Sequence, residues 1–179
     1  KHAQQSLRIV EELENDGEGL NLTWEVKQGI AYHSKPRGDF LSGEQTDGLR
    51  LEAQIVRISD AIAYLNHDLA DAFRAGILNE KDLPINIAGI LGKCHSERIN
   101  TMVCDLVTTS WATTGEKVDG FEVPQISMST QVREAVNTLR EFMFEYVYLP
   151  EDKGVTGEAA RRVMRLLYRY FTENPKNIP

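Results

Sequence analysis

Three polar side chains lie at a spacing that suits one shared ligand. Asp60, Tyr64 and Asp68 follow one another at intervals of four residues. On an α-helix this spacing keeps them within an arc of roughly 80° and spreads them over about 12 Å. The two carboxylates could therefore contact different parts of an elongated ligand, with the phenol ring between them. The spacing alone favours the solvated face of an amphipathic helix, and the wall of a binding cleft is the other interpretation.

The neighbours of this row argue for the cleft. Ile62, Ala63 and Leu65 place apolar side chains around most of the helix at the same level. Carboxylates enclosed by apolar groups need a cation or a hydroxyl group to offset the cost of burying their charge. We therefore expect a metal ion or a ligand hydroxyl at this face.

The helix that carries the row is the longest predicted element. Apolar residues from Leu51 to Phe73 recur at steps of three and four, and Gly76 is a natural residue to end the helix. Other helices are predicted at residues 3–14, 24–33, 97–110, from 129 onward, and 156–172. In the last of these, Val163, Leu166 and Tyr170 are expected to point inward. The pattern predicts one all-α domain over residues 1–179, a compact bundle or part of one.

Composition narrows the class of protein further. The 179 residues include 20 Lys and Arg against 27 Asp and Glu, for a net charge of −7. An acidic chain without a basic stripe repels phosphate backbones, which argues against nucleic acid as the main partner. No apolar run has the length of a membrane span and no signal peptide is recognisable, so we expect a cytoplasmic protein. Cys94 and Cys104 match no metal or redox motif and are predicted to be buried thiols.

The segment from Leu51 to Asp68, LEAQIVRISDAIAYLNHD, resembles the signature of the deoxyguanosine triphosphate triphosphohydrolase-like proteins. These proteins belong to the HD-domain metal-dependent phosphohydrolases. Further stretches agree in the same order: HAQQSLR at 2–8, LNLT at 20–23, Arg98-Ile99 with Met102 and Asp105, and LREFM at 139–143 before Val147-Tyr148. Because the agreement is spread along the chain, it is more specific than a short motif. The resemblance implies an HD-domain-like helical bundle, of which this chain would be the C-terminal part.

The resemblance also implies roles for four residues. Asp60 corresponds to the last ligand of a metal site that the family builds from a His, a His-Asp pair and an Asp. Tyr64 corresponds to a tyrosine that contacts the sugar, and Asp68 to an aspartate that accepts a hydrogen bond from the deoxyribose 3′-hydroxyl. His2 corresponds to a histidine that approaches the phosphates, and a capping or surface histidine is the alternative for it.

The metal ligands are incomplete in this sequence. No His-Asp dipeptide precedes Asp60, since the only one in the chain ends at Asp68. A rival metal set within the chain would consist of His33, His67, Asp68 and Asp105. It would take Asp68 out of the sugar-binding role, so the simpler expectation is that the first three ligands lie upstream of Lys1. The chain alone is then expected to be inactive, because one carboxylate and one histidine hold a divalent ion poorly.

The reaction that the resemblance implies is metal-dependent hydrolysis of a deoxynucleoside triphosphate to a deoxynucleoside and inorganic triphosphate. The full-length protein would use a divalent ion such as magnesium or manganese and would form a homo-oligomer. The alternative, from another class, is a catalytically silent helical module that binds nucleotides or a partner protein through the face from Asp60 to Asp68.

Overall fold

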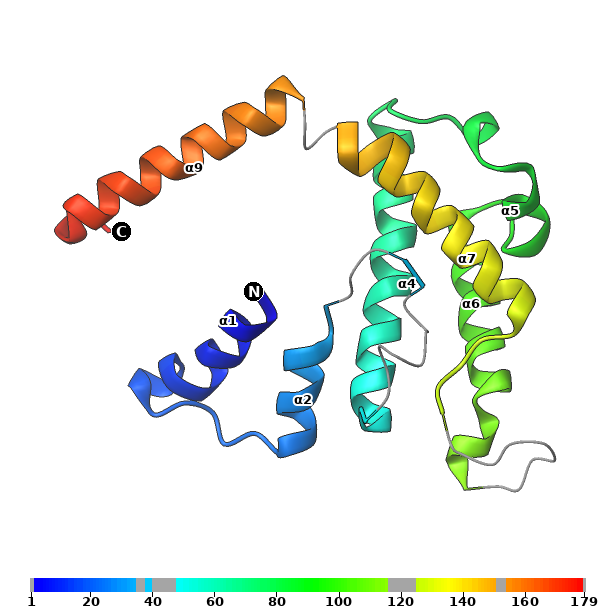
Figure 1. Ribbon diagram of the computed structural model, residues 1–179, viewed down its shortest axis with the longest axis horizontal. Helices are drawn as coiled ribbons and strands as arrows, with labels where there is room; N and C mark the ends of the chain where they lie inside the picture. Colours follow the sequence, from blue (N-terminus) through cyan, green and yellow to red (C-terminus); the bar gives the residue numbers. More distant parts are fainter. Residues whose placement is uncertain (1, 35–37, 40–47, 116–124, 151–153, 179) are drawn as a thin grey trace. The chain divides into compact units, whose positions relative to one another are not determined.

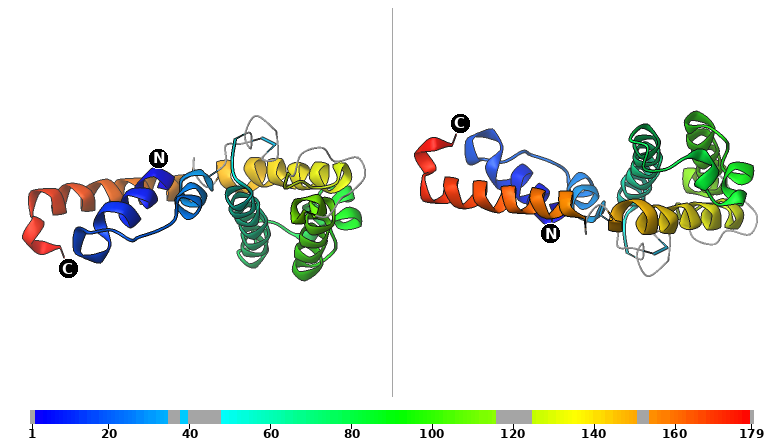
Figure 2. Two further views of the ribbon diagram at one scale, coloured as in Figure 1. Left: turned by 90° about the horizontal axis from the view of Figure 1, so that it is seen from below. Right: turned by 90° about the horizontal axis from the view of Figure 1, so that it is seen from above.

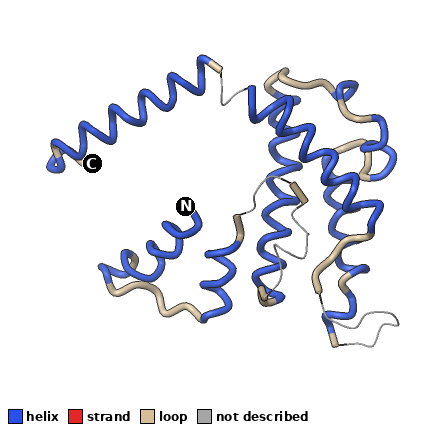
Figure 3. Tube along the Cα trace, viewed as in Figure 1, coloured by secondary structure: helices blue, strands red, loops and turns tan. Residues whose placement is uncertain are grey.

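The computed structural model describes residues 2–34, 38–39, 48–115, 125–150 and 154–178 (Figure 1). All regular secondary structure in these ranges is helical, and they contain no strand (Figure 3). The predicted all-α class is therefore confirmed. No helix within these ranges is long and apolar enough to cross a membrane.

The chain consists of two compact units, residues 1–141 and residues 142–179. The first unit holds the α-helices up to α7, whose last two residues fall in the second unit, and the second unit holds α9 with short helical turns on either side of it. Figure 2 gives two further views, in which α4 and α6 of the first unit run side by side. The expectation of a single domain over residues 1–179 stays a prediction.

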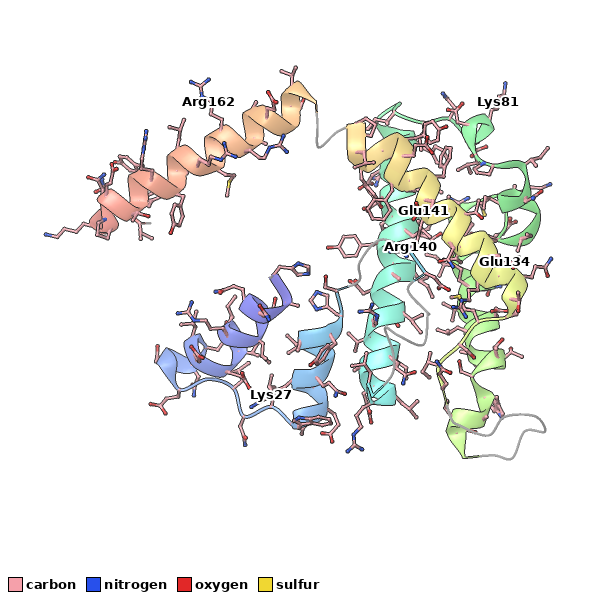
Figure 4. All side chains as sticks on the ribbon, in the orientation of Figure 1. Lys27, Lys81, Glu134, Arg140, Glu141 and Arg162 are labelled. Atoms are coloured by element: carbon pink, nitrogen blue, oxygen red, sulfur yellow. The ribbon has the colours of Figure 1, made fainter. Side chains whose placement is uncertain are left out.

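The first unit begins with a helical hairpin. Helix α1 (His2–Arg8) continues into a π-helical turn, η1 (Ile9–Leu13), and a 3-10 turn, η2 (Asn15–Gly17), precedes the loop to α2 (Trp24–Tyr32). Thr23 begins α2 as predicted, because its side chain accepts a hydrogen bond from the backbone N–H of Val26 at 3.5 Å. Lys27, labelled in Figure 4, reaches back from α2 and lies 3.1 Å from the carboxylate of Glu11.

Helix α4 (Leu51–Arg74) forms the centre of the first unit, where it packs against both α2 and α6. Its buried face explains the predicted periodicity, and it includes the fully buried Ile58 and Leu69. Gly76 follows the helix with a φ of 69°, in the left-handed conformation that commonly ends helices. The longest predicted element is therefore confirmed, including the way it ends.

Three further helices complete this core: α5 (Ile85–Ile90), α6 (His95–Thr109) and α7 (Thr130–Met143). Met102 of α6 and Leu139 of α7 are fully buried. The segment before α7 is attached to α4 and α6 by hydrogen bonds, since Ile126 N–H donates to Gln54 of α4 at 3.1 Å. Burial of apolar area at these contacts is the main force that holds the helices together.

Both cysteines are free, but the prediction that they are buried is wrong. Cys94 lies at the exposed start of α6, where its hydrogen bond with the Ser96 hydroxyl (3.2 Å) lowers the pKa of the thiol. Cys104 follows the buried Met102 by two residues, and two steps turn roughly 200° around a helix. Cys104 therefore faces away from the core.

The second unit contains α9 (Val155–Glu173), which has a wide apolar face as predicted. The prediction that this face points inward is wrong, because Val163, Leu166 and Tyr170 are all exposed. The short turn η6 (Pro175–Asn177) packs against α9 but is too short to cover the face. The arginines of α9 lie outside this face: Arg161 is nearly opposite to it, and Arg162, labelled in Figure 4, is at its edge.

Candidate functional site

The row predicted from the sequence lies on one uninterrupted helix. Asp60, Tyr64 and Asp68 are all within α4, so their four-residue spacing places them along one side of it. The Tyr64 side chain is 63% exposed, which leaves its ring accessible to a ligand, and both aspartates are half-buried. The two aspartates also have interaction partners within the structure. The arrangement provides two acceptor groups with an aromatic surface between them.

Apolar neighbours enclose this level of α4 only in part. Ile62 and Leu65 are buried, as the enclosing interpretation requires. Ala63 is exposed, so the row is open on that side. The carboxylates are therefore at the edge of the core rather than inside it.

Two grooves lie next to α4. One, of about 450 Å³, is formed mainly by α4, α6 and the turn after α6 and is lined by Ile55, Ser59, Ile62, Ala63, His67, Ile99, Val103, Leu106, Val107, Ser110, Trp111, Thr113, Thr114 and Ile126. The other, of about 460 Å³, is formed by α1, α2 and α4 and is lined by Ser6, Glu25, Val26, Gly29, Ile30, His33, Glu52 and Val56. Glu52 and Val56 precede Asp60 at the same four-residue spacing. The second groove therefore lies against the part of α4 that precedes the row, and Asp60, Tyr64 and Asp68 are not among its lining residues.

His2 is paired with a second histidine. It begins α1 and is exposed, and its Nε2 atom lies 3.2 Å from Nε2 of His33, which follows α2. The ring centroids are 5.1 Å apart. The Nδ1 atom of His33 lies 2.7 Å from the carbonyl oxygen of Ile30. Sequence reasoning missed this pair, because residues 31 positions apart come together only through the packing of α1 on α2.

A buried arginine holds the backbone on both sides of His33. Arg57 of α4 is 4% exposed, and its Nη1 donates hydrogen bonds to the carbonyl oxygens of Tyr32 (2.9 Å) and Ser34 (2.5 Å). Burial, and then the nearby charge of Arg140, lower the pKa of this guanidinium. The end of α2 is thereby attached to the helix that carries the row.

A second pair of histidines joins α4 to α6. The rings of His67 and His95 have centroids 5.1 Å apart. Arg98 lies one turn into α6, is 2% exposed, and donates a hydrogen bond to the carbonyl oxygen of Lys93 at 3.2 Å. Burial lowers the pKa of Arg98. This cluster supports the start of α6.

A metal site cannot be assembled from the described residues alone. Among them, no group of three or more His, Cys, Asp or Glu side chains lies close enough to hold an ion. The rival set is therefore wrong, and its members have other neighbours: His33 contacts His2, and Asp105 accepts a hydrogen bond from the backbone N–H of Ser129 at 2.9 Å. A divalent ion at Asp60 would need further ligands from outside these residues.

Comparison with known proteins gives consistent results along the chain. Residues 126–179 match the family model described as a phosphohydrolase-associated domain. The whole chain is 44% identical to a deoxyguanosinetriphosphate triphosphohydrolase-like protein of Caldanaerobacter subterraneus subsp. tengcongensis, of which it covers 47%. It is 40% identical to the protein of the same name from Clostridium perfringens strain SM101 and 37% identical to that of Clostridium tetani, and it covers 49% of each.

The chain thus spans about half the length of the curated relatives that it matches. The matches include all 179 residues, so the stretches that carry the resemblance in the sequence belong to one continuous region of similarity. The chain is therefore a homologue of the deoxyguanosinetriphosphate triphosphohydrolase-like proteins over about half of their length, and its residues 126–179 correspond to a phosphohydrolase-associated domain.

Proposed function

We propose that this chain forms part of a metal-dependent enzyme that hydrolyses deoxynucleoside triphosphates to a deoxynucleoside and inorganic triphosphate. The observation that carries the proposal is the row of Asp60, Tyr64 and Asp68 on a single face of α4. The names of the relatives that match the whole chain agree with a nucleoside triphosphate as the substrate. The enzyme would act in the cytoplasm as a homo-oligomer.

Each member of the row has a distinct role in this proposal. Asp60 supplies one carboxylate ligand to a divalent ion such as magnesium or manganese, and the remaining ligands come from outside this chain. Tyr64 offers its exposed ring to the sugar, and Asp68 accepts a hydrogen bond from the 3′-hydroxyl. A carboxylate is a suitable acceptor because hydrogen bonds to charged groups are stronger than neutral ones. His2, on α1, contacts the phosphates.

The metal ion, when bound, would supply positive charge to offset the triphosphate. The residues of this chain bind and orient the nucleotide. Tyr64 and Asp68 would hold the sugar, and Asp60 would hold the metal ion near the phosphates, at fixed positions along one helix. Orientation of this kind lowers the entropic part of the reaction barrier.

A second candidate function has an observation in its favour. Because the described residues assemble no metal site, they are also compatible with a helical module that binds nucleotides without cleaving them. In that case Tyr64 and Asp68 would still contact the nucleoside, and Asp60 would be a surface carboxylate. The two functions differ in whether tripolyphosphate is released.

The deciding experiment uses the full-length protein with each of the four deoxynucleoside triphosphates and either magnesium or manganese. We expect release of intact tripolyphosphate. Asp60→Ala should reduce this activity by at least about a hundredfold, because it removes a metal ligand. Asp71→Ala is the matched control, since Asp71 lies on the same helix and its side chain forms an exposed ion pair with Arg74.

Two results would contradict the proposal. Full activity in Asp60→Ala would show that the assignment of Asp60 is wrong. Nucleotide binding by the unmodified protein without any tripolyphosphate release would favour the silent module.

A further inference from the structure

The positions of the protons in the His2–His33 pair follow from its geometry. The carbonyl oxygen of Ile30 can only accept a hydrogen bond, so Nδ1 of His33 must carry a proton. In neutral His33 the Nε2 atom is then an acceptor. The atom 3.2 Å away is Nε2 of His2, which must therefore be the donor.

We infer that His33 is a positioning residue for His2: it accepts a hydrogen bond from the Nε2–H group of His2 and so directs Nδ1 of His2 toward the phosphates of the ligand. The inference rests on the proposed function only for the identity of that ligand. The hydrogen-bond relay runs from His2 to His33 and ends at the Ile30 carbonyl. Each donor in it has one acceptor.

The contact with His33 holds the His2 ring in one orientation, whether or not Nδ1 of His2 carries a proton. When Nδ1 of His2 takes up a proton, His2 still donates through Nε2 to His33, so the contact survives. The Nδ1–H group of His2 can then donate to an anionic phosphate oxygen.

Hydrogen bonds hold the backbone at both histidines. Arg57 binds the carbonyl oxygens on either side of His33, which fixes the end of α2. On α1, the hydroxyl of Ser6 donates to the carbonyl oxygen of His2 at 3.1 Å. His33 also lines the groove formed by α1, α2 and α4, together with Glu52 and Val56 of α4. The orientation of the relay thus depends on contacts that are present before any ligand binds.

Two substitutions separate the two hydrogen bonds of His33. His33→Gln places an amide oxygen near the position of Nε2, so it can still accept from His2. His33→Asn places an amide N–H near the position of Nδ1, so it can still donate to Ile30 but cannot reach His2. A residue that only supports the fold through Ile30 would be better replaced by Asn. A residue that positions His2 would be better replaced by Gln.

The first measurement needs no activity. In the 179-residue chain with ¹⁵N-labelled histidine, at a pH where both rings are neutral, nitrogen shifts report which ring nitrogen is protonated. We expect His33 to carry its proton on Nδ1 and His2 on Nε2. A proton on Nε2 of His33 would overturn the inference, whatever the protein hydrolyses.

The second measurement uses the full-length protein and tripolyphosphate release. His33→Asn should lower kcat by about tenfold with KM nearly unchanged, and His33→Gln should recover most of the loss. His95→Asn, from the other histidine pair, is the control and should retain full activity. In a His2→Ala background, His33→Asn should have no further effect, because coupled residues are not additive.

Additive losses, or a better rescue by Asn than by Gln, would overturn the positioning role. If the unmodified protein releases no tripolyphosphate, the proposed function fails. The nitrogen shifts then still decide whether the relay exists. The two failures are therefore distinguishable.

Discussion

At the scale of single residues, the sequence predicts which polar side chains share a helix face, but it does not predict their contacts in the fold. The sequence predicts that Asp60, Tyr64 and Asp68 share a face, because helical periodicity is a local property that neighbouring residues determine. The pairing of His2 with His33 depends on how two helices pack, and no local pattern encodes it. The exposure of Cys94 and Cys104 could not be predicted for the same reason, since the exposure of a helical residue depends on which face its helix buries.

Asp68→Asn tests the sugar contact at this scale. In the full-length protein we expect kcat/KM for a deoxynucleotide to fall about ten- to a hundredfold, because a hydrogen bond to a charged acceptor contributes roughly 1.5–3 kcal/mol. The preference for deoxy- over ribonucleotides should weaken with it, and the bound metal, measured by elemental analysis, should stay the same. Equal loss of metal and sugar discrimination would contradict the assigned role. Asp71→Asn serves as the control.

At the scale of elements, the connection between α1 and α2 requires a glycine at position 19. The sequence predicts a stop after residue 14 and a new helix after Thr23, and both are present. It does not predict the π-helical turn η1 or the close approach of Gly19 to Glu11. A Cβ atom at Gly19 would lie 2.1 Å from the Glu11 carbonyl oxygen. This contact determines how the chain returns toward α2, and with it the position of His33.

Gly19→Ala is therefore expected to destabilise the chain by about 2 kcal/mol or more, since it combines a steric clash with a left-handed backbone. Urea unfolding of the 179-residue chain measures the change. Gly17→Ala is the matched control, because Gly17 also has a positive φ (94°) but no atom lies within 4 Å of its added Cβ. Its expected cost is about 1 kcal/mol, and equal costs at both positions would show that the close approach is unimportant.

At the scale of the whole chain, the sequence predicts helices well and burial poorly. The predicted boundaries of α4, α6 and α9 lie close to those observed, because capping and periodicity are local signals. The apolar face of α9 is also correctly identified. Its exposure could not be predicted, because a sequence pattern shows that a face is apolar without showing what covers it. The relatives are about twice as long as this chain.

Leucine-to-alanine substitutions in the two units should therefore lower the free energy of unfolding by different amounts. Leu167→Ala on α9 should change the free energy of unfolding of this chain by less than about 0.5 kcal/mol, because Leu167 is 46% exposed. Leu139→Ala on α7 should cost about 2–5 kcal/mol, because Leu139 is fully buried. Urea unfolding compares the two variants. A large cost at Leu167 would show that its side chain is covered in solution.

The hydrogen bonds of Arg57 have a consequence for ligand length. The Arg57 guanidinium of α4 binds the carbonyl oxygens of Tyr32 and Ser34, on either side of His33. The histidine pair and the Asp60 row are therefore both attached to α4. If α4 moves along its axis, the histidine pair and the Asp60 row move with it, and the distance between them stays constant. Under the proposed function, this constant distance would select for the length of the phosphate chain, since a nucleotide with fewer phosphates would contact the Asp60 row but not His2.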